Sequence, residues 1–163
     1  MKHLFFICFL AVAVQSVYCQ QQATLTQSQR AAIRDSVTQL KYRVWDEVRA
    51  KHFEGTLNCF DDSPEFFWVF TPDTTIILHD VFVAMLKGAF QDYRSIDVVW
   101  DRIHVEPLTN QYAVYTGKYH VTYIDTSGKV FKAIGVETGI VVHRPTGWKI
   151  LNGQTFEARL KNE

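Results

Sequence analysis

The sequence has little cysteine, and most of what it has lies near the start of the chain. Two of its 3 cysteines, Cys8 and Cys19, fall within the first 19 residues. The remaining one, Cys59, has no partner for an internal disulfide, so the fold must depend on its hydrophobic core. The apolar neighbours of Cys59 favour a buried, inert thiol over a nucleophile.

An excess of charge of one sign is also lacking. Lys plus Arg and Asp plus Glu both number 17, and no block of like charge occurs. This excludes the basic patch of a nucleic-acid surface and the polybasic run of a membrane anchor. The sequence has no His-x-x-x-His or Cys-x-x-Cys spacing, no glycine-rich phosphate loop and no Gly-x-Ser-x-Gly motif. It therefore predicts neither a metal nor a cofactor.

The first residues have the form of a signal peptide. Lys2 and His3 precede an apolar run from Leu4 to Val14, which is too short to span a bilayer comfortably. Val17 and Cys19 are suitable before a cleavage site, so residues 1–19 are predicted to be removed. The alternatives are an uncleaved anchor and acylation of Cys19. Export, either secretion or delivery to a periplasm, is the expectation, with no membrane span left after cleavage.

The full chain is 47% hydrophobic and 14% aromatic, which is ample for the packed core of one domain. The order of elements after the leader, helices first and long antiparallel strands later, predicts the α+β class. Residues 20–27 form a loose segment, residues 28–158 the domain and residues 159–163 a tail. Thr26 and Gln29 have the spacing of a capping box for a helix that ends near His52. Gly55 should interrupt it before a short second helix or turn, and Asp80 should cap another helix.

Strands are predicted around and after these helices. Alternating aromatic residues near Trp68, a turn at 71–73 and the β-branched stretch 74–78 indicate a hairpin. Four more strands follow, at 98–105, 112–124, 130–143 and 148–158. Strict alternation would turn Val99, Ile103 and Val105 towards the interior. In the last strand it would turn Trp148, Ile150, Asn152 and Gln154 inward together.

This order of elements resembles the NTF2-like superfamily, in its SnoaL-like or DUF4440-like branch. The likeness rests on the N-terminal helix, the strand from Tyr112 to Gly117, the block from Glu137 to Arg144 and the ending from Gly147 to Leu151. It implies a strongly curved antiparallel sheet wrapped around N-terminal helices to form a cone with a pocket. The resemblance also implies relatives that are isomerases, cyclases or dehydratases. Many such relatives form dimers through the outer face of the sheet.

Two residues are candidates for acid–base chemistry. Glu137 is an isolated charge in an apolar strand, and its carboxylate faces either solvent or the cavity. His79 ends a strand near the expected opening of the cone. Burial raises the pKa of a carboxyl group towards the working pH, which suits it to act as a general base. Many relatives place a histidine at the position of Gln154, which cannot act as a base, and this departure weakens the case for catalysis.

The residues expected to bind a ligand combine aromatic rings with neutral amides, as ligand sites commonly do. They are Trp68, Tyr115, Tyr119, Trp148, Asn152 and Gln154. The leading hypothesis is an exported domain that binds a small, largely apolar molecule. The alternatives are a cofactor-independent isomerase or lyase of the ketosteroid-isomerase type, and an interaction module that forms a homodimer through its outer sheet face.

Overall fold

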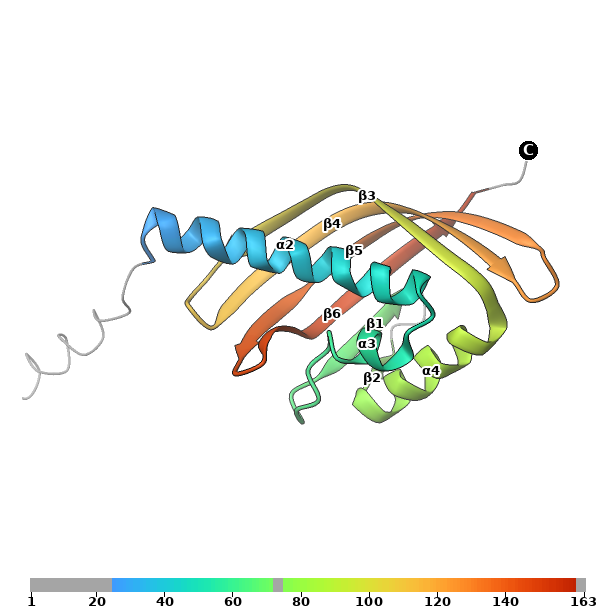
Figure 1. The fold of residues 1–163 in the computed structure, drawn as a ribbon, viewed down its shortest axis with the longest axis horizontal. Helices are drawn as coiled ribbons and strands as arrows, with labels where there is room; N and C mark the ends of the chain where they lie inside the picture. Colours follow the sequence, from blue (N-terminus) through green and yellow to red (C-terminus); the bar gives the residue numbers. More distant parts are fainter. Residues whose placement is uncertain (1–24, 72–74, 161–163) are drawn as a thin grey trace, which may run out of the picture.

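A computed structural model of the chain describes residues 25–71 and 75–160, so the predicted signal peptide lies outside the described residues. Within these described residues, three helices and six strands follow one another in an α+β arrangement, as the sequence predicts (Figure 1). They are α2 (Gln27–Arg49), α3 (Phe53–Leu57), β1 (Phe67–Thr71), β2 (Ile76–Ile77), α4 (His79–Asp92), β3 (Tyr93–Pro107), β4 (Tyr112–Asp125), β5 (Val130–Arg144) and β6 (Gly147–Arg159).

The strands form a single curved sheet in the order β2-β1-β6-β5-β4-β3. The predicted hairpin of β1 and β2 is present, while β1 runs parallel to β6 and the remaining pairs are antiparallel. Helix α2 lies along the concave face of the sheet, and α3 and α4 lie beneath one end of the sheet (Figure 1). This is the predicted cone.

The start of α2 is the one expected from the sequence. The Thr26 side chain accepts a hydrogen bond from the Gln29 backbone, and the Gln29 side chain accepts one from the Thr26 backbone. The helix buries Ile33, Val37, Leu40, Val44 and Val48 in one stripe. No helix within residues 25–71 and 75–160 is long and apolar enough to cross a bilayer.

Two predictions about the shorter helices are wrong. Helix α4 begins at His79 with Leu78 at the N-cap, and Asp80 lies inside the first turn. There its carboxylate interacts favourably with the partial positive charge at the start of the helix. Among the described residues it does not form a capping hydrogen bond. Gly55 lies within α3 instead of separating the two helices. A Cβ at Gly55 would lie 2.1 Å from the Glu47 side chain, so the position has no room for one.

The predicted faces of β3 and β6 are also corrected, because each strand carries a β-bulge. In β6 the partner of Val141 is Ile150 and the partner of Ile140 is Asn152, so Leu151 is an extra residue. In β3, Asp101 is extra in the same way. A bulge shifts the alternation of side chains by one position. Val99 is consequently 58% exposed, although Ile103 and Val105 do turn towards the interior.

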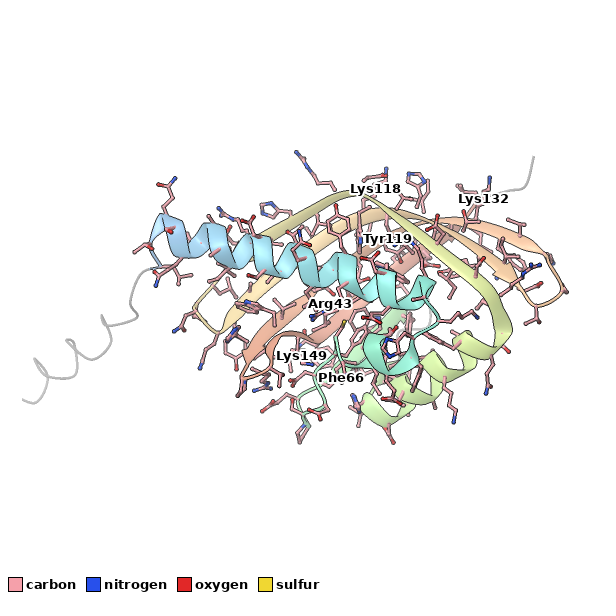
Figure 2. All side chains as sticks on the ribbon, in the orientation of Figure 1. Arg43, Phe66, Lys118, Tyr119, Lys132 and Lys149 are labelled. Carbon is pink, nitrogen blue, oxygen red and sulfur yellow. The ribbon has the colours of Figure 1, made fainter. Side chains whose placement is uncertain are left out.

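The concave face of β4 and β5 carries aromatic rings that lie flat against glycines. Tyr119 points inward while its neighbour Lys118 points out to solvent (Figure 2). A Cβ on Gly135 would lie 2.2 Å from the Tyr119 ring, and a Cβ on Gly139 would lie 2.9 Å from the Tyr115 hydroxyl. These glycines leave the space that the two tyrosines need beside Glu137.

Candidate functional site

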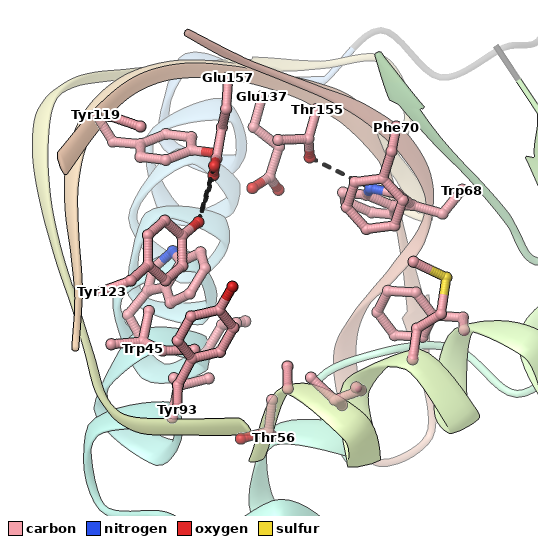
Figure 3. A pocket seen from close by; sticks show the side chains of 18 of the residues that line it. Trp45, Thr56, Trp68, Phe70, Tyr93, Tyr119, Tyr123, Glu137, Thr155 and Glu157 are labelled. Carbon is pink, nitrogen blue, oxygen red and sulfur yellow. Dashed lines mark hydrogen bonds between the residues drawn. The ribbon is translucent and has the colours of Figure 1, made fainter. Parts of the chain in front are cut away.

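A cavity of about 400 Å³ lies between the concave face of the sheet and the helices α2 and α4 (Figure 3). Its size is that of a site for a small organic molecule. Its walls are mainly apolar and aromatic. They include Val44, Trp45, Val48, Phe60, Trp68, Phe70, Phe82, Met85, Leu86, Ala89, Tyr93, Ile96, Tyr119, Tyr123, Phe131 and Ala133.

One polar group of the cavity is centred on Glu137 of β5. The Lys41 ammonium, which α2 presents, forms an ion pair with Glu137 Oε1, and the side chains are only 1% and 6% exposed. The Tyr115 hydroxyl donates to the same oxygen at 2.6 Å. Burial and the adjacent carboxylate raise the pKa of Tyr115, so its hydroxyl stays protonated and donates.

The Lys41 ammonium is enclosed by aromatic rings as well as by the carboxylate. Its Nζ lies 4.3 Å from the centre of the Tyr115 ring and 5.5 Å from that of Trp100. Both separations allow a cation–π interaction. The protein therefore stabilises one buried ammonium with a carboxylate, a phenol and an indole.

A second polar group is centred on Glu157 of β6. Tyr119 donates to Glu157 Oε1 at 2.7 Å, and Tyr123 donates to Oε1 at 2.7 Å and to Oε2 at 2.9 Å. Burial and the Glu157 charge raise the pKa of both phenols above their usual range, so both remain protonated donors. Figure 3 shows the two tyrosines on one wall with their hydroxyls at the carboxylate.

The wall also includes two exposed cations, Lys132 and Arg159, and several neutral polar groups. The Trp68 indole donates to Thr155 Oγ1 at 3.2 Å. The Tyr93 hydroxyl points into the cavity (Figure 3). The Trp45 indole N–H is buried and has no partner among the described residues. The wall thus offers a ligand both hydroxyl and carboxylate groups within a largely apolar space.

The structure brings several of the candidate residues to this cavity. Of the two orientations open to Glu137, it shows the inward one, and the carboxylate points to the middle of the cavity (Figure 3). Trp68 and Tyr119 line the wall, while Tyr115 lies behind it and reaches Glu137. His79 lies elsewhere, at the start of α4, with its ring 5.3 Å from that of Phe66, and it lines a separate pocket of about 770 Å³.

The last strand contributes different residues from those expected. Trp148 packs against His143 at the far end of the sheet, Asn152 is half-buried outside the cavity, and Gln154 is exposed. Beyond the bulge, Thr155 and Glu157 face inward in place of the two amides. Sequence reasoning also missed Lys41. Its position four residues after Val37 and three before Val44 was the signal, because it places a charge within the apolar stripe.

The other candidate chemistry lies away from the cavity. Cys59 is 1% exposed, and burial raises the pKa of its thiol. That is the environment of a structural cysteine. Within residues 25–71 and 75–160 no cluster of three or more His, Cys, Asp or Glu side chains could hold a metal ion.

Comparison with known proteins shows the fold. No protein-family model matches the chain, and no curated protein sequence matches it. Solved structures do, among them an NTF2-like superfamily protein from Salmonella enterica serovar Typhimurium, at 14% identity and a TM-score of 0.66 over 81% of this chain and 94% of that one. The hexachlorocyclohexane dehydrochlorinase LinA-type3 from Novosphingobium barchaimii matches at 10% identity and a TM-score of 0.67, over 85% and 97%.

A conserved protein from Planctomyces limnophilus matches at 15% identity and a TM-score of 0.67, over 80% of this chain and all of the other. The chain therefore has the NTF2-like fold, in which a curved sheet and its helices enclose a cavity. A fold of this kind hosts many activities, so the function has to be argued from the cavity itself.

Proposed function

We propose that the chain is an exported domain that binds a small, largely apolar molecule in the cavity between α2, α4 and the sheet. The observation that carries the proposal is a space of about 400 Å³ whose wall is mostly aromatic and aliphatic. The hydrophobic side of α4 supports it, since Met85, Leu86 and Ala89 line this space. Export rests on the leader-like residues 1–19.

Filling the cavity should prevent binding of a neutral apolar probe. We expect the dye N-phenyl-1-naphthylamine to fluoresce in the wild-type cavity, and Ala89→Phe to lose most of that signal because its ring occupies the same volume. Ala84→Phe places the same ring on the exposed side of α4 and should bind dye like the wild type. Fluorescence titration measures both. Equal binding by the two variants would show that the dye does not enter the cavity.

Acid–base catalysis is a second candidate, because Glu137 carries a carboxylate into an apolar cavity. Lys41 and Tyr115 both bind Oε1, and no described residue donates a hydrogen bond to Oε2, which leaves that oxygen for an acidic C–H of a substrate. The hydroxyls of Tyr115, Tyr119 and Tyr123 already donate to carboxylates. Tyr93 is thus the hydroxyl placed to donate to an enolate oxygen.

This candidate requires turnover that depends on Glu137. A β,γ-unsaturated ketone would lose an α-proton to Glu137 Oε2 and regain it at the γ-carbon, and the conjugated product is followed by its ultraviolet absorption. We expect Glu137→Gln to abolish any such rate, while Glu54→Gln, at an exposed position of α3, leaves it unchanged. A rate that survives in Glu137→Gln would rule out this role. A dehydrochlorinase among the structures of similar fold supports testing for proton abstraction.

A homodimer through the outer sheet face is the partner that the exposed surface favours. Val136 and Phe156 are cross-strand neighbours on β5 and β6, and they are 45% and 50% exposed. Phe67 of β1 adds a third exposed apolar side chain to this face. Patches of this kind mark interaction surfaces.

Sedimentation velocity at micromolar concentration measures the association. We expect a dimer for the wild type and a monomer for Val136→Glu, because the new charge would be buried without a partner. Val130→Glu, at the start of β5 and also exposed, should remain dimeric. A wild-type monomer at these concentrations would contradict the proposal.

A further inference from the structure

The cavity contains two carboxylate–phenol groups, and only the first of them includes a cation. Glu137 receives the Tyr115 hydroxyl and the Lys41 ammonium. Glu157 receives the hydroxyls of Tyr119 and Tyr123, but none of the ion pairs within residues 25–71 and 75–160 involves it. The second group therefore has the donors of the first without its cation.

We propose that the ligand of this cavity is an amphipathic amine, whose ammonium group binds Glu157 and whose apolar body fills the aromatic space. This inference rests on the proposed binding function and specifies its ligand class. An ammonium at Glu157 would complete the arrangement that the chain already uses to hold Lys41. A partly buried carboxylate with an opposite charge beside it is far better compensated than one stabilised by phenols alone.

Aromatic rings surround Glu157 as they surround Lys41. The Tyr93 and Tyr123 rings lie 5.2 Å apart, and the Trp45 and Tyr119 rings lie 6.3 Å apart, all on the cavity wall. A cation among such rings gains attraction from their faces. At the same end, the Arg159 guanidinium lies over the Phe131 ring at 4.8 Å, and Lys132 is exposed. Arg159 thus stacks on an aromatic ring and leaves Glu157 without an ion pair.

The hydrogen-bonding capacity of the wall points to the same class. The Lys41 ammonium and the hydroxyls of Tyr115, Tyr119 and Tyr123 are all directed at carboxylate oxygens. The cations Lys132 and Arg159 also line the cavity, but both are exposed and Arg159 lies over Phe131. The carboxylate acceptors of the wall, Glu137 Oε2 and Glu157, therefore have no cation among the described residues paired with them inside the cavity. An ammonium group brings three donors together with the complementary charge, whereas a carboxylate ligand would bring further acceptors and repulsion.

Three probes with one apolar body separate charge from hydrophobicity. They are 2-(1-naphthyl)ethylamine, 2-(1-naphthyl)ethanol and 1-naphthaleneacetate, each titrated calorimetrically into the full chain at neutral pH. We expect the amine to bind about tenfold more tightly than the alcohol, as for a hydrogen-bonded charge pair, and the carboxylate to bind most weakly. Glu157→Gln should remove the advantage of the amine, because it keeps an acceptor for the two phenols but loses the charge.

Controls separate this proposal from the binding function itself. Glu54→Gln removes an exposed carboxylate that does not line the cavity and should keep the tenfold preference. Thermal melts of both variants establish that they are folded. Equal binding of the three probes, tighter binding of the carboxylate, or a preference that survives in Glu157→Gln would overturn the amine proposal while dye binding still supports the cavity. Failure of the neutral dye to bind would overturn the proposed function as well.

Discussion

Replacing Lys41 by methionine is expected to lower the free energy of unfolding by about 3–5 kcal/mol, because it leaves the Glu137 carboxylate buried without its cation. Lys41 is 1% exposed and Glu137 4%, and no other ion pair among the described residues involves Glu137, so no second cation replaces the ammonium. Urea denaturation followed by circular dichroism measures the loss.

The double variant tests whether the two residues act as a pair. Lys41→Met combined with Glu137→Gln removes both charges and keeps an acceptor for Tyr115, so most of the lost stability should return. Lys118→Met is the matched control, because Lys118 pairs with Asp101 at 3.3 Å on the exposed face. It should cost less than about 1 kcal/mol. Additive losses in the double variant would show that the buried pair is not coupled.

Substituting alanine for Gly139 should have the next largest effect. The new Cβ would lie 2.3 Å from the backbone oxygen of Asn152 and 2.9 Å from the Tyr115 hydroxyl. Backbone gives way less readily than a side chain, so we expect a loss of about 1–3 kcal/mol in the free energy of unfolding, as for overpacked cores. The near-ultraviolet circular dichroism of the tyrosines should change as Tyr115 moves away from Glu137.

Gly88→Ala is the control for this substitution. Gly88 lies in α4, and a Cβ there would have nothing within 4 Å. Alanine should raise the free energy of unfolding by about 0.5–1 kcal/mol, because it restricts the unfolded chain without a clash. If the Gly139 variant were as stable as the wild type, the close approach of β5 and β6 at this point would be wrong.

The sequence was most informative where a local rule decides the structure. The capping box at Thr26 and the stripe from Ile33 to Val48 depend only on contacts within one helix, and both are as predicted. The long strands were found for a similar reason, since their turns are marked by glycine and polar residues. The tyrosines of β4 were placed correctly because that strand has no bulge.

The site was harder to predict because it depends on pairings between strands. The extra residues Asp101 and Leu151 become visible only when each strand is set against its neighbour. Nothing in the local sequence around Leu151 marks the shift, so Asn152 and Gln154 were assigned inward in place of Thr155 and Glu157. Lys41 was missed for another reason, since an isolated lysine in a helix is usually solvated and its partner is 96 residues away.

The bulge at Leu151 decides which side chains of β6 reach the ligand. If Leu151 were an ordinary residue of the strand, the alternation after it would turn Asn152 and Gln154 towards the ligand and Thr155 and Glu157 towards solvent. Deletion of Leu151 would instead make the pairing with β5 regular and keep Thr155 and Glu157 inward. The choice between an amide and a carboxylate in the wall therefore lies in strand pairing, and a shift of one residue in register would change the ligand class without any substitution.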